Sequence, residues 1–447
     1  MDAEILARLQ FAFTAGFHYI FPPISIGLGV ILIIMEGMYL KTGNEMYEQM
    51  TKFWVKIFGL VFAIGVASGI VLEFEFGTNW SNYSRYVGDV FGSALAAEGV
   101  FAFFLESGFL AILLFGWDKV SKKMHFISTV LVAFGAHFSA IWIIVANSWQ
   151  QTPAGHHIVQ EAGRVRAEIV DFWAVVFNPS TLDRLSHTIM GAWQAGAWIV
   201  ISVSAYYLLK KRHVEISKTA MKIAVVIALV ASIGQLVTGH SSGVTVAETQ
   251  PAKLAAFEGQ YETEVADLAI IGWVDEGNEK VIGIKFPKML SWLIYGDTTT
   301  PVTGLNEFAE EDRPPVQITF QAYHFMVALG MLLILLAVVF AVGTWRGFIF
   351  EQPWLLKIGI VAVILPMISN QLGWIAAEVG RQPWVVYNLL RTSEGLSPEV
   401  SAGQVLGSLI GFVLIYALLF ALFIFLFDSK IKHGPEEPWR QMEGKRA

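Results

Sequence analysis

The sequence predicts an all-α integral membrane protein with about nine transmembrane helices, an outside N-terminus, an inside C-terminus and a long outer loop between the sixth and seventh helices. Of the 447 residues, 55% are hydrophobic and 15% are charged, and the mean hydropathy is +0.56. A soluble domain normally contains about 25% charged residues. The composition therefore places the chain in a lipid bilayer and excludes an ordinary soluble protein.

Spanning helices are predicted wherever about 20 apolar residues follow one another, because that length crosses the hydrocarbon core. Nine such runs occur, at residues 17–40, 54–76, 95–117, 126–148, 187–209, 220–239, 318–343, 356–378 and 405–427. Their order divides the chain into helices one to six (1–239), an outer loop (240–317), and helices seven to nine with an inner tail (318–447). The loop is far longer than an ordinary helix connection, which indicates a function of its own.

The distribution of lysine and arginine predicts the orientation, because cytoplasmic loops carry an excess of these residues. Fifteen lie in the short connections after odd-numbered helices and in the C-terminal tail, and twelve lie in the much longer segments on the other side. The fifteen are Lys41, Lys52, Lys119, Lys122, Lys123, Lys210, Lys211, Arg212, Lys218, Arg346, Lys430, Lys432, Arg440, Lys445 and Arg446. The N-terminus and the 240–317 loop are therefore predicted outside, and the C-terminus inside.

The chain contains no cysteine and has a formal net charge of -7 at pH 7. Without thiolates it cannot hold an iron–sulfur cluster, a Cys-ligated zinc ion or covalently attached c-type haem. Any metal must therefore be bound by His, Met or carboxylate groups. The basic residues form no continuous face, so membrane lipid is an expected partner and nucleic acid is not.

Two histidines within the predicted helices are candidates for function, because ionisable groups are costly to bury in lipid. His18 opens the first predicted helix, and Pro22 has no N–H for the carbonyl of His18, so a kink is predicted beside this imidazole. Either a metal or haem ligand or a hydrogen-bonded structural histidine is compatible with that kink. His187 opens the fifth helix, and the small residues after it admit either a flat macrocycle or another helix.

The seventh predicted helix carries His324 and Met326. They are separated by about 200° of helical rotation, so both cannot face one iron. Methionine in a membrane helix commonly fills space. A His and a Met on two different helices are nevertheless the ligand set of a low-spin, electron-transferring haem.

Carboxylates form the second group of candidates. Glu98 and Glu106 lie on roughly one face of the third helix, about 12 Å apart along its axis. Glu106 falls near mid-membrane, where a proton relay explains a carboxylate better than a structural role does. Glu73 and Glu75 lie near a helix end, where snorkelling to the interface explains them.

The end of the eighth helix carries a polar stripe. Its members are Asn370, Trp374, Glu378 and Arg381, spaced four, four and three residues apart. The alternative is a Glu–Arg pair at a helix end, which contributes little.

Five of these candidates are predicted at a common depth. With the orientation above, the outer half of the bilayer contains His18, Glu98, His187, Met326 and Glu378. Independent structural residues should be scattered in depth. The common level therefore predicts cofactors near the outer face.

Four sequence runs closely resemble subunit I of the cytochrome bd-type quinol oxidases. They are residues 75–80 (EFGTNW), 97–107 (AEGVFAFFLES), 139–147 (SAIWIIVAN) and 380–384 (GRQPW), and the resemblance extends over essentially the whole chain. It implies a subunit of a bacterial cell-membrane terminal oxidase that carries three haems, oxidises quinol at the outer face and reduces dioxygen to water. It further implies a proton gradient made by vectorial chemistry without a pump, a second subunit of related fold, and a small single-helix subunit as a further partner.

The resemblance assigns roles residue by residue. His187 and Met326 match the axial ligands of the family's low-spin haem b. His18 and Glu378 match positions associated with two high-spin haems, one b and one d, the latter replaceable by haem b. Glu98 is a further candidate near that pair, and which residue serves which haem stays open. Trp374 and Arg381, on the stripe of Glu378, are expected to contact the same cofactors.

In the outer loop, residues 253–258 (KLAAFE) resemble the family's quinol-binding segment. Lys253 could steady a quinone oxygen, and Glu258 could accept a quinol proton. The residues alone, without the resemblance, indicate a solvated surface pair. Glu106 and Glu98 are expected to pass protons towards the haems.

Two other functions, a haem–copper oxidase and a transporter, also use polar residues within the membrane. A haem–copper oxidase needs a cluster of intramembrane histidines, but the adjacent pair His156 and His157 lies in an outer segment, so this reading is rejected. A transporter could use Glu98 and Glu106 as coupling carboxylates. It predicts internal hydropathy repeats, which are not evident, and no bound haem.

Overall fold

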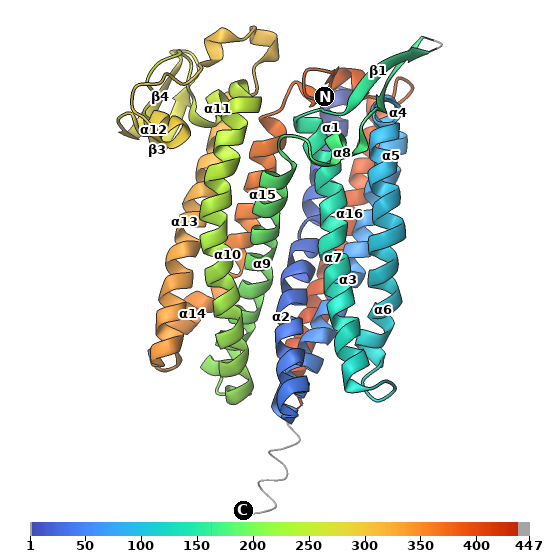
Figure 1. Ribbon diagram of the computed structural model, residues 1–447, viewed down its shortest axis with the longest axis vertical. Coiled ribbons are helices and arrows are strands. Elements are labelled where there is room, and N and C mark those ends of the chain that lie inside the picture. Colours follow the sequence, from blue (N-terminus) through green and yellow to red (C-terminus); the bar gives the residue numbers. More distant parts are fainter. Residues whose placement is uncertain (1, 162, 437–447) are drawn as a thin grey trace, which may run out of the picture.

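The computed structural model describes residues 2–161 and 163–436. Within these residues, nine stretches of helix are long and apolar enough to cross a membrane, which confirms the predicted number. Figure 1 shows them as one upright bundle. The end that carries the N-terminus and residues 251–315 is called the N-terminal face below, and the end where residues 210–213 join two helices is called the opposite face.

The first span is broken in two. It consists of α1 (Ala3–His18) and α2 (Phe21–Thr42), with Tyr19 and Ile20 between them. Proline occupies the first turn of α2, where its missing N–H costs nothing, so a new helix begins there. The predicted kink is confirmed, but His18 was wrongly placed at the start of the helix: it closes α1.

Two other spans are also interrupted. α5 (Gly88–Ala97) continues through a π-helical turn, η1 (Glu98–Phe103), into α6 (Phe104–Phe115). α14 (Pro353–Ala362) gives way to α15 (Ile364–Val379), because Pro366 has no N–H for the carbonyl of Ala362. The uninterrupted spans are α3 (Glu45–Thr78), α7 (Lys122–Gln151), α9 (Thr181–Leu209), α10 (Val214–Thr249), α13 (Val316–Arg346) and α16 (Ala402–His433).

Helix α10 continues ten residues past the predicted start of the outer loop at residue 240. The extra turns are polar, which is why hydropathy ended the helix early. Their side chains are bonded to a neighbouring helix: Ser241 Oγ donates to Asp183 of α9 at 2.5 Å, and the hydroxyl of Thr245 donates to the same carboxylate. The segment between the sixth and seventh spans therefore begins at Gln250.

Short elements connect the spans. At the N-terminal face they are α4 (Ser81–Tyr86), α8 (Phe172–Val176), α11 (Pro251–Glu258), α12 (Met289–Tyr295), and the 3-10 turns η2 (Leu305–Glu307), η3 (Glu310–Asp312) and η5 (Ser393–Gly395); η4 (Phe348–Glu351) follows α13. Three antiparallel hairpins join them, β1 (His156–Glu161) with β2 (Arg164–Ile169), β3 (Leu268–Asp275) with β4 (Lys280–Phe286), and β5 (Trp384–Val386) with β6 (Leu390–Arg391). The long connection is thus a folded unit that covers the ends of α10 and α13 (Figure 1).

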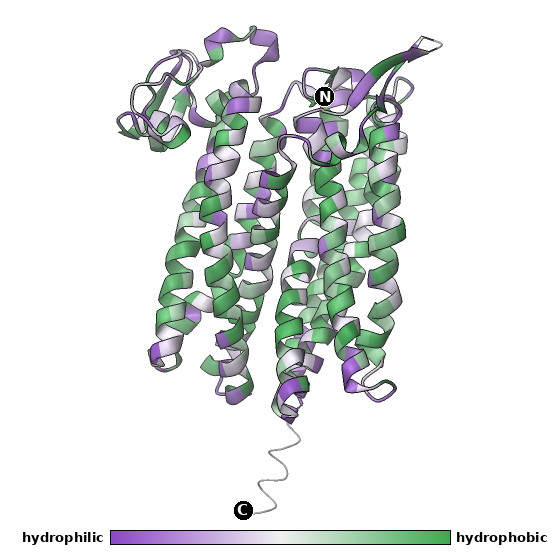
Figure 2. Ribbon diagram, in the orientation of Figure 1, coloured by the Kyte–Doolittle hydropathy of each residue, from purple (hydrophilic) through white to green (hydrophobic). Residues whose placement is uncertain are grey.

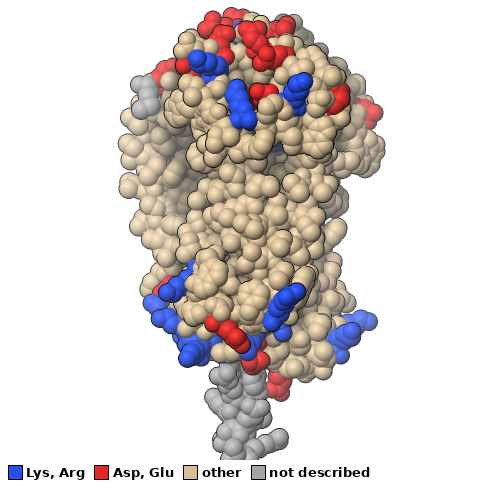
Figure 3. Space-filling model, turned by 90° about the vertical axis from the view of Figure 1, so that its left-hand side faces the viewer, with Lys and Arg blue, Asp and Glu red and all other residues tan. Residues whose placement is uncertain are grey.

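The surface matches a membrane-spanning bundle. Apolar residues dominate the long helices, and hydrophilic residues concentrate at the two ends (Figure 2). On the side shown in Figure 3, Lys and Arg gather at the opposite face, while Asp and Glu dominate the N-terminal face.

The main apolar core fills the half of the bundle nearer the opposite face, where Trp54, Phe58, Trp198 and Phe340 are fully buried. A buried polar contact also crosses this half: His125 Nδ1 of α7 lies 2.7 Å from Glu36 Oε1 of α2. The polar candidate residues of the eighth helix lie in the other half. The apolar core and the polar stripe of the eighth helix therefore occupy different halves of the bundle.

Helices α2 and α9 touch backbone to backbone. A Cβ atom added to Gly27 would lie 2.8 Å from the Cα of Gly196 and would clash with the carbonyl of Ala192. Only glycine permits this approach, which is the usual way that membrane helices gain packing contacts.

We expect Gly27→Ala to lower the thermal unfolding temperature of the purified protein, at a cost of about 1–3 kcal/mol, because the helices must separate. Gly37→Ala, on the same helix, is the matched control, since a Cβ there would meet only the Phe126 ring at 3.5 Å. An equal effect of both substitutions on the unfolding temperature would contradict the close-contact explanation.

Candidate functional site

His187 of α9 is held by its Nδ1 atom. This nitrogen lies 3.0 Å from the hydroxyl of Thr238 on α10, and that hydroxyl donates its own hydrogen to the carbonyl of Gly234 at 2.8 Å. The imidazole therefore donates from Nδ1, and Nε2 keeps its lone pair. The ring lies against Gly239, where an added Cβ would be 3.3 Å from its Cε1 atom.

His18 is held in the same way. Its Nδ1 atom lies 3.1 Å from the hydroxyl of Ser68 on α3, which donates to the carbonyl of Gly65 at 3.0 Å. Its ring lies against Gly69, where an added Cβ would be 2.9 Å from Cε1. Each histidine thus faces a hydroxyl residue followed by a glycine on a neighbouring helix.

This arrangement is the one that ligating histidines adopt, because a metal-bound imidazole donates its other N–H to fix the ring. Other histidines of the bundle differ. His137 has Nδ1 on the carbonyl of Ala133 at 2.8 Å, and its Nε2 accepts from the indole of Trp193 at 2.9 Å. Its two nitrogens are therefore used within the protein. Sequence reasoning missed the hydroxyl–glycine pairs, Ser68–Gly69 and Thr238–Gly239, although both are visible as motifs.

Met326 and His324 of α13 point in different directions, as predicted. Both ring nitrogens of His324 lie close to backbone carbonyls, Nδ1 2.9 Å from that of Phe320 and Nε2 3.0 Å from that of Ala269 in β3. The sulfur of Met326 instead faces α15, 3.0 Å from where a Cβ of Gly373 would lie. Because α13 and α9 both pack on α10 and α15, Met326 and His187 belong to one four-helix group.

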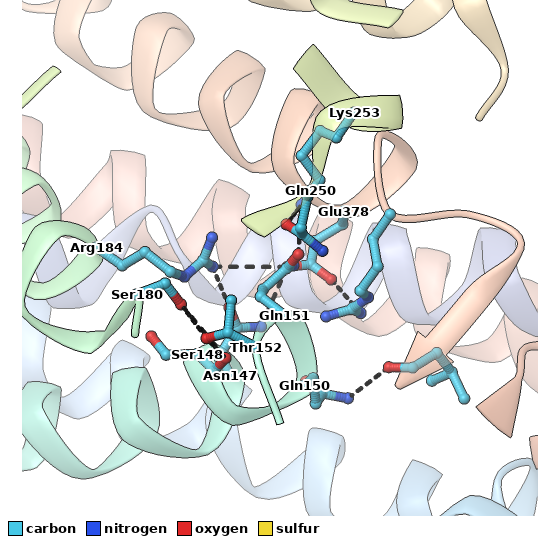
Figure 4. Close-up of polar contacts among 12 residues, drawn as sticks. Asn147, Ser148, Gln150, Gln151, Thr152, Ser180, Arg184, Gln250, Lys253 and Glu378 are labelled. Atoms are coloured by element: carbon cyan, nitrogen blue, oxygen red, sulfur yellow. Dashed lines mark hydrogen bonds and ion pairs between the residues drawn. The ribbon is translucent and has the colours of Figure 1, made fainter. Parts of the chain in front are cut away.

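Glu378, at the end of α15, is the centre of a polar network (Figure 4). Its Oε1 atom accepts hydrogen bonds from the side-chain amides of Asn147 and Gln151 on α7, both at 3.1 Å, and its Oε2 atom forms an ion pair with Arg381. Arg184 of α9 lies 3.9 Å away and also donates to Asn147. The predicted stripe is correct as far as Glu378, but Arg381 lies beyond the end of α15.

Lys253 enters the same network from α11. Its ammonium group donates to the side-chain oxygens of Gln250, at 2.5 Å, and of Gln151. Lys253 is 2% exposed and Glu258 is 5% exposed. The alternative of a solvated surface pair is therefore wrong. The two side chains also do not pair, since five residues on a helix separate them by about 140°.

Positive charge exceeds negative charge in this network. Lys253, Arg184 and Arg381 surround the single carboxylate of Glu378, and the pKa of Lys253 is lowered well below its usual value by burial and by the two arginines. Nε of Arg184 and Nη1 of Arg381 are buried and have no hydrogen-bond partner among the described residues. The cluster is suited to an anionic group.

Trp374 connects this network to the neighbourhood of His18. Its ring lies 5.4 Å from that of Tyr19, and the guanidinium of Arg184 lies 5.7 Å from its centre. Asn370, one turn further along α15, donates to the carbonyl of Gly191 on α9 at 3.4 Å. Sequence reasoning placed Trp374 on the correct face but missed Arg184, which stands before the predicted start of the fifth helix.

Glu258 lies at the end of α11 in a different environment. Burial raises its pKa to about 8. The Oε2 atom has no hydrogen-bond partner among the described residues, and the closest cation candidate is Nε2 of His324 at 3.8 Å. A carboxyl of this kind takes up and releases a proton near neutral pH.

Glu98 and Glu106 both face α7. The hydroxyl of Ser139 donates to Glu98 Oε1 at 2.7 Å, and a Cβ added to Gly135 would lie 2.7 Å from Cγ of Glu106. In a regular helix their eight-residue spacing would turn them about 80° apart. The π-helical turn η1 lies between them, and its extra residue brings them back towards one side.

No group of three or more His, Asp or Glu side chains in the described ranges is placed to hold a metal ion jointly. The candidate ligands stand singly. Single ligands suit a haem, whose macrocycle provides four of the iron's bonds and leaves one or two to the protein.

The sequence matches the cytochrome bd terminal oxidase subunit I family over residues 6–435. It is 42% identical to the cytochrome bd ubiquinol oxidase subunit 1 of Bacillus subtilis (strain 168), over 98% of this chain and 95% of that protein. It is 35% identical to the cytochrome bd-II ubiquinol oxidase subunit 1 of Escherichia coli (strain K12), over 98% and 99%. The solved structure of bd oxidase from Geobacillus thermodenitrificans has a TM-score of 0.90 and 28% identity, covering 97% of this chain and 99% of that one.

These matches extend over nearly the full length of the chain, so they concern the whole bundle and not one motif. They confirm the resemblance found in the sequence, the all-helical fold, and the assignment to a bacterial membrane as a multi-pass protein. The chain belongs to the cytochrome bd terminal oxidase subunit I family.

Proposed function

We propose that this chain is the haem-bearing subunit of its oxidase and that it oxidises quinol at the N-terminal face and reduces dioxygen to water. Membership of the family makes it a subunit of a respiratory terminal quinol oxidase, a quinol:oxygen oxidoreductase. The observation that carries the haem proposal is the shared arrangement of His18 and His187, in which each Nδ1 is bonded to a hydroxyl and each Nε2 has no hydrogen-bond partner among the described residues.

His187 and Met326 are proposed to hold a low-spin haem b. His18 and Glu378, with Glu98 nearby, are proposed to serve a high-spin haem b and a third haem of type d or b. Such groups supply the iron that carries electrons and binds dioxygen. The protein's part is to fix the ligands: Thr238 and Ser68 orient the imidazoles, and Asn147, Gln151 and Arg381 orient the carboxylate.

The charge imbalance around Glu378 supports this proposal. Three cationic side chains face one carboxylate, and buried charges persist only when they are paired. A haem carries two propionate groups, whose negative charges would offset the excess of Lys253, Arg184 and Arg381. The same cluster would then join α11 to the cofactor region.

Quinol is proposed to bind at α11. Glu258 has the burial and the raised pKa expected of a group that accepts a quinol proton, and Lys253 on the same helix donates towards the Glu378 network. Electrons released there would need to cross only the short distance from α11 to α15. The proposed donor is ubiquinol or menaquinol.

The N-terminal face is proposed to lie outside. The gathering of Lys and Arg at the opposite face supports this orientation (Figure 3), although Arg440, Lys445 and Arg446 lie outside the described residues. Protons consumed at the haems would then travel from inside, and moving each charge against the membrane potential stores about 2.3 kcal/mol per 100 mV. The chemistry would build a gradient without a pump.

Glu106 and Glu98 are proposed as the last steps of that proton path, along the face of α7 marked by Gly135 and Ser139. A second oxidase subunit would supply the inner part. It and a small single-helix subunit remain the expected partners. Exposed apolar side chains provide surface for these partners or for lipid, among them Phe101 and Phe104 beside the two glutamates and Leu418 and Phe425 on α16.

We expect Met326→Leu to abolish the low-spin b-type band in the reduced-minus-oxidised visible spectrum, because leucine has no thioether to bind iron. Oxygen binding at the high-spin site should survive. Met331→Leu is the matched control on the same helix, since Met331 is 54% exposed. An unchanged low-spin band in Met326→Leu would show that Met326 only fills space.

Quinol-driven turnover should rise with pH up to about 8, because the carboxyl of Glu258 is neutral below its raised pKa and can accept a proton only above it. Glu258→Gln should lower the turnover at least tenfold and remove this pH dependence, while the haem spectra stay unchanged. The measurement is kcat/KM for quinol as a function of pH. The control Glu310→Gln changes an exposed carboxylate and should keep the wild-type pH profile. The same wild-type profile in Glu258→Gln would exclude Glu258 as the proton acceptor.

Glu106→Gln keeps the shape of the side chain and removes its titrating proton, so proton-coupled oxygen reduction should slow by at least tenfold. The first electron should still reach the low-spin haem. Flow-flash oxidation of the fully reduced enzyme with a pH dye measures both. The neighbouring control Ser107→Ala should take up protons at the wild-type rate. If Glu106→Gln took up protons at that same rate, the proton path would run elsewhere.

A further inference from the structure

The side chain of Glu75 on α3 lies in a different environment from the one that the sequence predicted. Snorkelling to the interface was expected for Glu73 and Glu75, but Glu75 is 1% exposed, and only Glu73 is an exposed side chain. The two carboxylates stand two residues apart on one helix and have opposite environments. Glu75 points into the bundle between α1, α3 and α16.

Neither carboxyl oxygen of Glu75 has a hydrogen-bond partner among the described residues. Its polar neighbours are Thr14 and Gln10 of α1. The hydroxyl hydrogen of Thr14 is used elsewhere, because Thr14 Oγ1 donates to the carbonyl of Gln10 at 3.0 Å or to that of Phe11 at 3.1 Å. No hydrogen bond of ordinary geometry among the described residues therefore reaches this carboxyl, although the Gln10 side chain lies close to it.

Glu75 belongs to a continuous line of buried polar side chains, which we call the polar seam: Gln10, Thr14, Ser68, Glu75 and Asn79. Towards the N-terminal face, Gln10 Oε1 accepts from Asn79 Nδ2 and from Ser408 Oγ of α16, both at 3.1 Å. The carbonyl of Asn79 accepts a hydrogen bond from the backbone N–H of Ser397 at 2.9 Å. Asn79 is therefore the end of the seam nearest the N-terminal face.

The other end of the seam is His18. Ser68 bonds to its Nδ1 atom, and the hydroxyl of Tyr416 on α16 donates to the carbonyl of Ser68 at 2.9 Å. Along α1, the spacing of residues 10, 14 and 18 keeps the polar groups on one face, and residues 68, 75 and 79 do the same along α3. From Asn79 to Ser68 the seam extends about 16 Å along the helix axis.

A purely structural seam would leave no group unsatisfied. Polar groups that hold membrane helices together do so by bonding to each other, and an unpartnered buried carboxyl destabilises the fold. Buried polar groups that the protein leaves unpaired are normally bridged by water molecules. The unsatisfied carboxyl lies midway between two stretches that are bonded, so water at Glu75 would complete the line.

We propose that the polar seam is a water-filled path that links the neighbourhood of His18 to the N-terminal face and releases the water formed from dioxygen. The release role rests on the proposed function. Two quinols and one dioxygen yield two quinones and two waters, so each cycle delivers two water molecules to the proposed haem region, of which His18 is part. The seam is the polar route from that residue to the N-terminal face along α1 and α3.

Water in the seam can be detected without enzyme turnover. Brief X-ray irradiation makes hydroxyl radicals from water, and mass spectrometry of the whole purified protein locates the side chains that they label. Tyr416 is 1% exposed and contacts the seam, whereas Trp198 is fully buried in the apolar core. We expect Tyr416 to be labelled at least fivefold faster than Trp198. Equal rates would overturn the water-filled path.

Substitutions then test the role of Glu75. Glu75→Leu should reduce the labelling rate of Tyr416 to that of Trp198. Glu75→Gln stays polar and should fold even if the leucine variant does not. It should retain at least half of the wild-type labelling rate of Tyr416. Glu73→Gln is the matched control and should leave labelling unchanged. Wild-type labelling in Glu75→Leu would show that the carboxyl does not hold the water.

The release role is tested by steady-state turnover. Glu75→Leu should lower kcat at saturating quinol at least threefold, with KM for quinol and the visible spectrum unchanged, since the defect follows electron transfer. Lost labelling with a normal kcat would overturn the release role. If the proposed function itself failed, turnover would be absent in the wild-type protein, whereas the labelling result would stand.

Discussion

The half of the bundle nearer the N-terminal face depends on the hydrogen-bonded carboxylate of Glu378. Its partners come from α7, α9 and the segment after α15, and Gln151 extends the network to Lys253 on α11. In a low-dielectric interior such a network is strong when complete and costly when any member is missing. The network links the long connection to the bundle, includes Arg184 over Trp374, and joins α7 to α15 through side-chain hydrogen bonds.

Much of the fold could be predicted from the sequence, because lipid imposes a simple rule: each span must be an apolar helix of a certain length. The break beside His18 was also predictable, since the missing N–H of Pro22 acts locally. The errors lie where tertiary contacts override hydropathy. α10 keeps its helical form through ten polar residues because Asp183 of α9 binds their hydroxyl groups. Hydropathy treats those residues as loop, since it does not include the neighbouring helix.

The site was only partly predictable for a related reason. His18, His187 and Glu378 stand out because they are ionisable groups near lipid. Arg184 and Lys253 do not, because they occur in segments that look like outer connections. The resemblance identified Lys253, whereas Arg184 was missed. Packing buries Lys253 and leaves Arg184 partly buried. The π-helical turn between Glu98 and Glu106 has no signal in the residue pattern. The hydroxyl–glycine pairs are visible in the sequence, but only their packing against the two histidines shows their role.

Those pairs also bear on how electron-rich the two imidazoles are. A carboxylate acceptor at Nδ1 would draw the proton towards itself and make the ring more anionic, and therefore a more electron-rich ligand. Ser68 and Thr238 offer a neutral oxygen whose hydrogen is already committed to a helix carbonyl. Each ring therefore keeps its hydrogen on Nδ1, and Nε2 carries an ordinary imidazole lone pair. Replacing either hydroxyl by a carboxylate would make the ring more electron-rich and would favour the oxidised form of an iron bound at Nε2.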